Sequence, residues 1–389
     1  MRERGLWRVT SALGLVEILN WGTSYYLLAV LAGPVAADTG WPLPWIVGSL
    51  SAGLLVAGLA LPRIGRAIGR HGGRPVLATA SAVLALGLAV IGLAPSLPVF
   101  VAGWLILGLG MGAGLYDAAF ATLGRLYGAA ARPAISAVTL WGGFASTVCW
   151  PLSAVLVAQC GWRGTCLVYA GLHLAVSLPL ILRALPPAPP RPEAAPGEEP
   201  SGTGPRAGEQ RAFRLLAAIM TVGGAASAIV SVHLLTLLQA QGLALAAAVA
   251  LGALIGPAQV GARVIEMANR GRHHPLWTLT AAMGLVALGL ALLWAGIPAV
   301  GLALVCYGAG NGLASIARGT LPLALFGPAR YAALVGRLAL PNLLAQALAP
   351  SLGALLIARG GPEAALALLA ALAATNVVLV AGLWRVARS

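Results

Sequence analysis

The feature that most limits the fold of this chain is an internal repeat at about half its length. Residues 65–75 read GRAIGRHGGRP, and residues 261–275 read GARVIEMANRGRHHP, so that Arg70 matches Arg270 at an offset of 200 positions. The offset continues downstream, where the glycines at 108, 110 and 112 match those at 308, 310 and 312. Each arginine-rich segment separates two long apolar runs. We infer a duplicated chain built from two similar halves.

The composition indicates that lipid is the solvent for much of the chain. Hydrophobic residues make up 59% of it and charged residues only 9%, whereas a soluble domain carries about 25% charged residues. The apolar runs do not alternate as barrel strands do, so each is expected to cross the membrane as a helix. We predict an all-α integral membrane protein with twelve transmembrane helices in two pseudo-symmetric six-helix halves. The predicted spans are 9–33, 45–64, 75–94, 98–122, 133–158, 164–184, 212–238, 243–265, 275–296, 298–321, 333–358 and 363–384.

The placement of arginine predicts the orientation. The chain has no lysine, and its basic residues are 24 arginines. With the N-terminus inside, all of them except Arg163 and Arg359 fall on the cytoplasmic side, which is the positive-inside pattern. We therefore expect a multi-pass protein of the cell inner membrane with both termini in the cytoplasm. The net charge of +14 then follows from membrane orientation, and we expect no nucleic-acid partner.

One segment differs in kind from the apolar runs. Residues 185–211 are rich in Pro, Gly and Glu and nearly free of bulky apolar side chains, a composition that does not build a packed core. We predict a flexible cytoplasmic linker between an N-terminal half at 1–184 and a C-terminal half at 212–389.

The arginine-rich turn between the second and third spans resembles the signature loop of the major facilitator superfamily. The family pattern is Gly-x-x-x-Asp-Arg-x-Gly-x-Arg-Arg, which Gly65, Arg70, Gly72 and Arg74 follow, while Gly69 stands where the family has its aspartate. The resemblance covers nearly the whole length. It implies a secondary active transporter that works by alternating access around a central cavity lined in part by the first span.

Within that superfamily, the chain is similar to the monocarboxylate and oxalate–formate porters. The segment Asp38-Thr39-Gly40-Trp41 and the pair Ala262-Arg263 carry this similarity. It implies a small organic anion as substrate, with Arg263 as a functional arginine whose guanidinium can clamp a carboxylate. Alternatively, Arg263 is a positive-inside anchor neutralised by Glu266. The branch's acidic partner is Gln259 here.

Ionisable groups inside spans are costly and point to function. Glu17 lies in the first span and shares one helical face with Asn20, Trp21 and Tyr25. We predict that Glu17 binds and releases the coupling proton and that the other three side chains contact substrate. A structural hydrogen bond to a neighbouring helix is the alternative for Glu17.

Charges near the cytoplasmic ends of the spans are candidates for an inner gate. Asp117 and Arg318 occupy nearly matching positions of the two halves, and Arg70 and Arg74 lie in the signature loop. We predict a gate that closes through opposite charges and opens when they separate. Ordinary interfacial charges that extend to water are the alternative.

Three further expectations concern packing. The repeated glycines are expected to allow close approach or bending of helices, and Trp162 to anchor the chain at the membrane interface. Pro341, Asn342 and Pro350 suggest a broken eleventh span.

No catalytic, cofactor or metal-binding pattern is present, so we expect neither an enzyme nor a bound cofactor. We expect a functional monomer in a lipid bilayer that binds a small-molecule substrate and protons. Two alternatives stay open: an efflux pump for a hydrophobic or xenobiotic compound, and a non-transporting receptor on a transporter fold.

Overall fold

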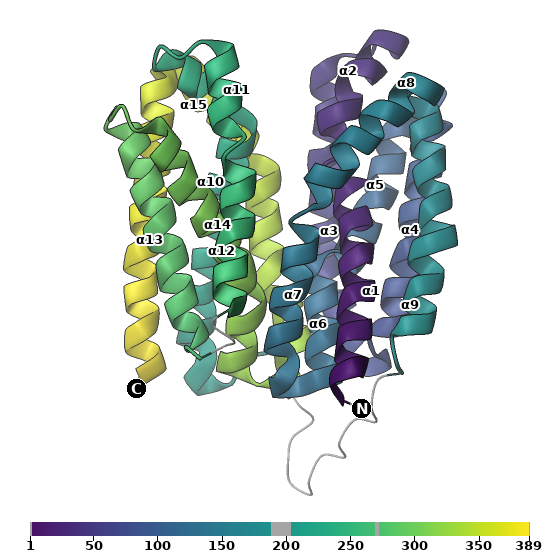
Figure 1. Ribbon diagram of the computed structural model, residues 1–389, viewed down its shortest axis with the longest axis vertical. Coiled ribbons are helices and arrows are strands. Elements are labelled where there is room, and N and C mark those ends of the chain that lie inside the picture. The colour runs from purple at the N-terminus through teal and green to yellow at the C-terminus, as the bar shows by residue number, and fades with distance from the viewer. Residues whose placement is uncertain (1, 188–203, 269–271, 389) are drawn as a thin grey trace, which may run out of the picture. The chain divides into compact units, whose positions relative to one another are not determined.

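The computed structural model describes residues 2–187, 204–268 and 272–388, and these segments are helical without any β-strand (Figure 1). Most of the predicted linker at 185–211 lies outside the described residues, as does Arg270. Contacts divide the chain into two compact units. Unit 1 comprises Met1–Gly204 with Phe326–Leu340, and unit 2 comprises Pro205–Leu325 with Pro341–Ser389.

The helices of each unit follow the order of the apolar runs. Those of unit 1 are α1 (Arg2–Gly22), α2 (Leu28–Thr39), α3 (Leu43–His71), α4 (Gly73–Gly92), α5 (Leu97–Gly114), α6 (Tyr116–Tyr127), η1 (Gly128–Ala131), α7 (Arg132–Gly142), α8 (Ala145–Leu172), η2 (His173–Ser177) and α9 (Leu178–Ala184). The remaining elements are η3 (Ala207–Glu209), α10 (Gln210–Ala240), α11 (Leu245–Gly252), α12 (Ile255–Ala268), α13 (Pro275–Trp294), α14 (Val300–Phe326) and α15 (Pro328–Arg388).

Eight helical stretches of the described chain are long and apolar enough to cross a membrane. They are Leu43–His71, Gly73–Gly92, Leu97–Ala184, Gln210–Ala240, Ala246–Ala268, Pro275–Trp294, Val300–Phe326 and Pro328–Ala387. Two of them contain more than one predicted span, since α8 and α15 each turn through a non-helical glycine, Gly161 and Gly361. The left-handed φ at these glycines, 69° and 77°, is a conformation that side chains with a Cβ rarely adopt.

Several predicted spans are interrupted. The first, predicted as continuous over 9–33, breaks between α1 and α2, and the fourth breaks at Leu115, whose backbone is extended. The fifth breaks after Gly142 and the eighth after Gly252. Apolar periodicity does not reveal such breaks, because the residues on both sides remain hydrophobic.

The repeated glycines mark repeated helix contacts, as the sequence predicted. In unit 1, a Cβ on Gly108 of α5 would collide with the backbone of Gly53 of α3. In unit 2, a Cβ on Gly308 of α14 would lie 2.7 Å from the Ile255 oxygen of α12. Gly110 and Gly310 are equally close to backbone atoms of α4 and α13. Only glycine permits backbones to approach so closely.

The prediction of a broken eleventh span is wrong. Helix α15 runs through Pro341 and Pro350, and Gly361 is the residue with non-helical dihedral angles within it. Prolines are tolerated in such helices where a neighbouring helix supplies new hydrogen-bond partners. Helix α10 contacts α15 at this point, where His233 Nε2 lies 2.8 Å from the Pro350 oxygen.

Candidate functional site

The break between α1 and α2 shapes the part of unit 1 that carries the predicted site. Residues 23–27 form turns, in which the Tyr26 N–H reaches back to the Trp21 oxygen at 3.0 Å. The Thr23 hydroxyl donates to the Leu19 oxygen at 2.8 Å, and the Ser24 hydroxyl donates to the Asn20 oxygen. Hydroxyls that bond to the preceding turn in this way compete with the helical ladder, so Thr23 and Ser24 account for the break locally.

Glu17 lies on α1 less than two turns before the break, and it is fully buried. Neither of its carboxyl oxygens makes a hydrogen bond to a described residue. The indole of Trp21 lies beside this carboxyl, but its Nε1 also lacks a hydrogen-bond partner among the described residues. The alternative of a structural hydrogen bond for Glu17 is therefore not seen in the described structure.

Asp117 is the charged neighbour of Glu17. It lies in the first turn of α6, directly after the break at Leu115, and is 7% exposed. Its carboxyl group interacts electrostatically with that of Glu17. The sequence assigned these two acids to different tasks, proton coupling and gating, yet the fold brings them together.

Aromatic rings surround the break. Trp21 contacts Tyr25, Tyr26 and Tyr116, with ring centroids 5.4, 5.9 and 5.0 Å apart. Sequence reasoning found the first pair from helical spacing but missed Tyr26, which lies in the turns after α1, and Tyr116, which belongs to α6. Asn20, the remaining predicted contact, is buried and donates its Nδ2 to the Gly114 oxygen at 2.7 Å. Asn20 thereby ties α1 to the last turn of α5.

In unit 2, Arg263 on α12 is 5% exposed and lies against α14. Its Nε donates to Ser315 Oγ at 3.1 Å, and its Nη2 lies 3.4 Å from Gln259 Oε1. The Arg263 guanidinium is therefore held inside the protein, where it donates to the neutral oxygens of Ser315 and Gln259.

Arg318 lies one turn beyond Ser315 on α14. The Asn342 amide is oriented so that both of its polar atoms have partners. Asn342 Oδ1 accepts from Arg318 Nη1 at 3.3 Å, and Asn342 Nδ2 donates to the Met220 oxygen at 2.8 Å. Arg318 belongs to unit 2 and Asp117 to unit 1, so their pairing in a gate stays a prediction.

The signature loop contributes Arg70 at the end of α3 and Arg74 at the start of α4. Arg70 is exposed, whereas Arg74 donates Nη2 to the Leu182 oxygen of α9 at 2.6 Å. Arg74 therefore joins the loop to the last helix of the same unit.

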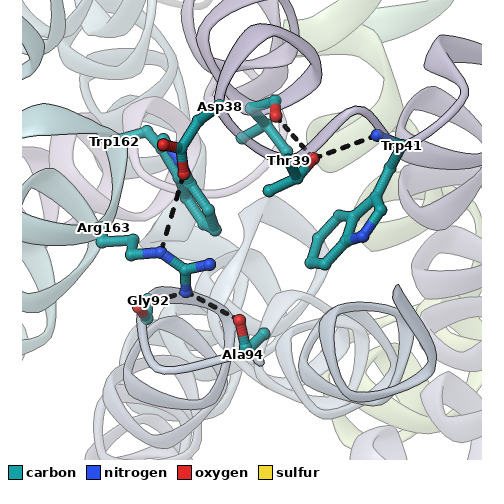
Figure 2. A network of polar contacts seen from close by, with 8 residues as sticks. Asp38, Thr39, Trp41, Gly92, Ala94, Trp162 and Arg163 are labelled. Carbon is teal, nitrogen blue, oxygen red and sulfur yellow. Dashed lines mark hydrogen bonds and ion pairs between the residues drawn. The ribbon is translucent and has the colours of Figure 1, made fainter. Parts of the chain in front are cut away.

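A second polar network lies at the other end of unit 1 (Figure 2). Asp38 Oδ2 accepts from Trp162 Nε1 at 2.9 Å and lies 3.8 Å from Arg163 Nε, while Arg163 Nη1 donates to the Ala94 oxygen at 2.7 Å. Trp162 is 4% exposed, so the expectation of an interfacial anchor is wrong: its ring is enclosed, with Phe100 6.2 Å away. The network ties α2 to the α4–α5 turn and to the bend in α8.

Long apolar helices, breaks within them and charged side chains buried beside those breaks define a helical multi-pass membrane protein that handles solutes. The family model of the Major Facilitator Superfamily matches residues 13–272. The chain belongs to this superfamily of transporters, as its signature loop predicted.

The chain is similar to human "Monocarboxylate transporter 11", at 30% identity over 270 residues that cover 66% of this chain and 53% of that protein. It thus spans about half the length of this curated relative. Among solved structures, it resembles FucP, the fucose:proton symporter of E. coli, in its outward conformation (TM-score 0.73, 13% identity, 96% of this chain and 98% of that one). It also resembles the proton:xylose symporter XylE (TM-score 0.72, 12% identity, 99% and 96%). At these identities the two structures support the fold.

Proposed function

We propose that this protein is a proton-coupled secondary transporter of a small organic anion of the monocarboxylate kind, working by alternating access. The observation that carries the proposal is the fully buried carboxyl of Glu17, which makes no hydrogen bond to a described residue. A carboxylate kept ionised there would be costly, and a second acid, Asp117, lies nearby. Such a group is suited to take up and release a proton as its surroundings change.

The proposed anion would bind at Arg263, the buried guanidinium of unit 2, because a guanidinium can hold a carboxylate through two parallel charge-assisted hydrogen bonds. For unit 1, we propose Asn20, Trp21 and Tyr25 as substrate contacts. The similarity to a protein named as a monocarboxylate transporter supports this substrate class. We further propose twelve spans in two six-helix halves joined by residues 185–211, with both termini cytoplasmic, in the cell inner membrane, and a functional monomer.

Uptake of labelled pyruvate into proteoliposomes tests the coupling. An inward proton gradient is expected to accelerate uptake by the unmodified protein, and Glu17→Gln is expected to abolish this acceleration while leaving pyruvate exchange at equal pH. Glu363→Gln, at an exposed glutamate of α15, serves as the matched control and should respond normally. Uptake that ignores the gradient in the unmodified protein would refute proton coupling.

Arg263→Lys tests the anion site. Lysine keeps the charge but loses the planar pair of donors, so the KM for pyruvate should rise by about 10-fold or more, equivalent to a loss of ~1.4 kcal/mol. Arg385→Lys, at an exposed arginine near the end of α15, should leave the KM unchanged. An unaltered KM in Arg263→Lys would place the substrate carboxylate elsewhere.

The aromatic cluster around Trp21 favours a second candidate, the efflux of a hydrophobic compound. Ring faces of Trp and Tyr bind flat apolar molecules and organic cations. Thermal shifts of the purified protein separate the candidates: stabilisation by tetraphenylphosphonium but not by monocarboxylates would favour efflux, and the reverse would favour the anion.

A further inference from the structure

Two irregular helical segments of unit 1 face each other. One is the break at residues 23–27, where the Tyr26 N–H bonds to the Trp21 oxygen, and the other is the π-helical element η2, where the Leu178 N–H bonds to the His173 oxygen. The first is an i→i−5 turn at the end of α1, and the second is a π-helical turn within a helix. π-Helical turns are rare and frequently lie at functional sites.

A single side-chain hydrogen bond joins the two segments. Thr23 Oγ1 and His173 Nε2 are 2.7 Å apart, and both residues are fully buried. The Thr23 hydroxyl has one proton, which it donates to the Leu19 oxygen at 2.8 Å. With that proton on the Leu19 oxygen, Thr23 accepts from His173. We therefore assign the Nε2–H tautomer to His173, which leaves Nδ1 as an acceptor.

The stability that this bond adds to the fold does not explain why position 173 is a histidine. His173 Nδ1 has no hydrogen-bond partner among the described residues, and leaving a buried polar atom unsatisfied costs free energy. On average this cost exceeds what a side-chain hydrogen bond between membrane helices contributes. An apolar side chain at position 173 would stabilise the fold more. The role of His173 is therefore to hold Thr23 in position.

Thr23 is held between two elements. On one side is His173, and on the other Gly22 packs directly against Cys149 of α8, whose Sγ lies 3.6 Å from the Ile18 oxygen. The start of the break is therefore fixed, and Tyr25 follows two residues later with its ring 5.4 Å from that of Trp21.

We propose that His173 is a positioning residue for substrate binding: through its hydrogen bond to Thr23 it fixes the start of the break and thereby the placement of Tyr25 against Trp21. This inference rests on the proposed function insofar as the ring pair contacts substrate. It extends the site to an element, η2, that contributes no side chain to the candidate site itself.

The test combines transport with backbone exchange. His173→Phe and Thr23→Val each remove the bond, so each should raise the KM for pyruvate about five-fold with little change in kcat. The double variant should equal either single one, since the same bond is lost once. His173→Gln, whose amide N–H can donate to Thr23, should restore most of the affinity. The matched control is Ser153→Ala, which breaks another buried 2.7 Å bond, to the Tyr169 hydroxyl, and should leave the KM unchanged.

Hydrogen–deuterium exchange of the peptide covering residues 19–30 decides the inference independently of substrate. Exchange should rise about ten-fold in His173→Phe and Thr23→Val but not in Ser153→Ala. If the unmodified protein transports no monocarboxylate while exchange rises as expected, the proposed substrate is wrong and the positioning of the break stands. Unchanged exchange in His173→Phe, or additive effects of the two substitutions on KM, would overturn the inference.

Discussion

Replacing Glu17 by methionine is expected to stabilise the fold while it removes proton coupling. The Glu17 side chain is fully buried, and both carboxyl oxygens lack a hydrogen-bond partner among the described residues. Leaving a buried polar group unsatisfied costs about 1–3 kcal/mol. Methionine has a similar length, adapts its shape to the space and has no such group, so the free energy of unfolding should rise by about 1–3 kcal/mol.

The measurement is reversible unfolding in mixed micelles with increasing dodecyl sulfate, followed by tryptophan fluorescence. Tyr169→Phe gives the opposite contrast, because the equally buried Tyr169 hydroxyl is bonded to Ser153 Oγ at 2.7 Å. Its loss should cost about 1 kcal/mol. If Glu17→Met is destabilised by more than about 1 kcal/mol, the carboxyl has a partner in the folded protein, and the reasoning for a group poised to exchange protons fails.

Two further predictions concern packing. Gly308→Ala should destabilise unit 2 by about 1–3 kcal/mol, because the new Cβ would lie 2.7 Å from the Ile255 oxygen. The control Gly284→Ala places its Cβ in open space and should be neutral or stabilising. Equal unfolding curves of the two variants would contradict the close contact at Gly308. Trp162→Phe should cost less than about 1 kcal/mol, since Asp38 is 56% exposed and water can replace the lost donor, but Trp162→Ala should cost ~3–5 kcal/mol. A large loss in Trp162→Phe would show that the hydrogen bond, rather than the ring, holds this end of the unit together.

Membrane insertion and the helix contacts could be predicted from the sequence because both depend on patterns that recur along the chain. Long apolar runs require helices in lipid, and glycines repeated at one offset indicate backbones that approach closely. The contacts at Gly108 and Gly308 confirm that expectation. The acid in the first span could also be selected, since an ionisable group in an apolar run is costly wherever it lies.

The arrangement around that acid could not be predicted, because it depends on contacts between distant residues. Helical spacing placed Tyr25 on the face of Glu17, but the break rearranges that face and brings in Tyr116 from α6. The signal for the break was local, in the consecutive hydroxyls of Thr23 and Ser24, yet such residues also occur in unbroken helices. Thr23 and His173, which share a hydrogen bond, are 150 positions apart in the sequence. No local sequence pattern predicts such a contact.

The glycine contacts indicate which parts of each unit are rigid and which parts can bend. Where α3 and α5 pack backbone to backbone, at Gly53 and Gly108, no side chain separates them, so a change of rotamer cannot let one helix slide on the other there. They should move as single bodies. Any change of shape within a unit then concentrates at the interruptions: residues 23–27, Leu115, and the turns after Gly142 and Gly252. The hinges of the protein then lie within its helices. In unit 1, the hinge at residues 23–27 lies less than two turns from Glu17, and the hinge at Leu115 comes directly before the turn that carries Asp117.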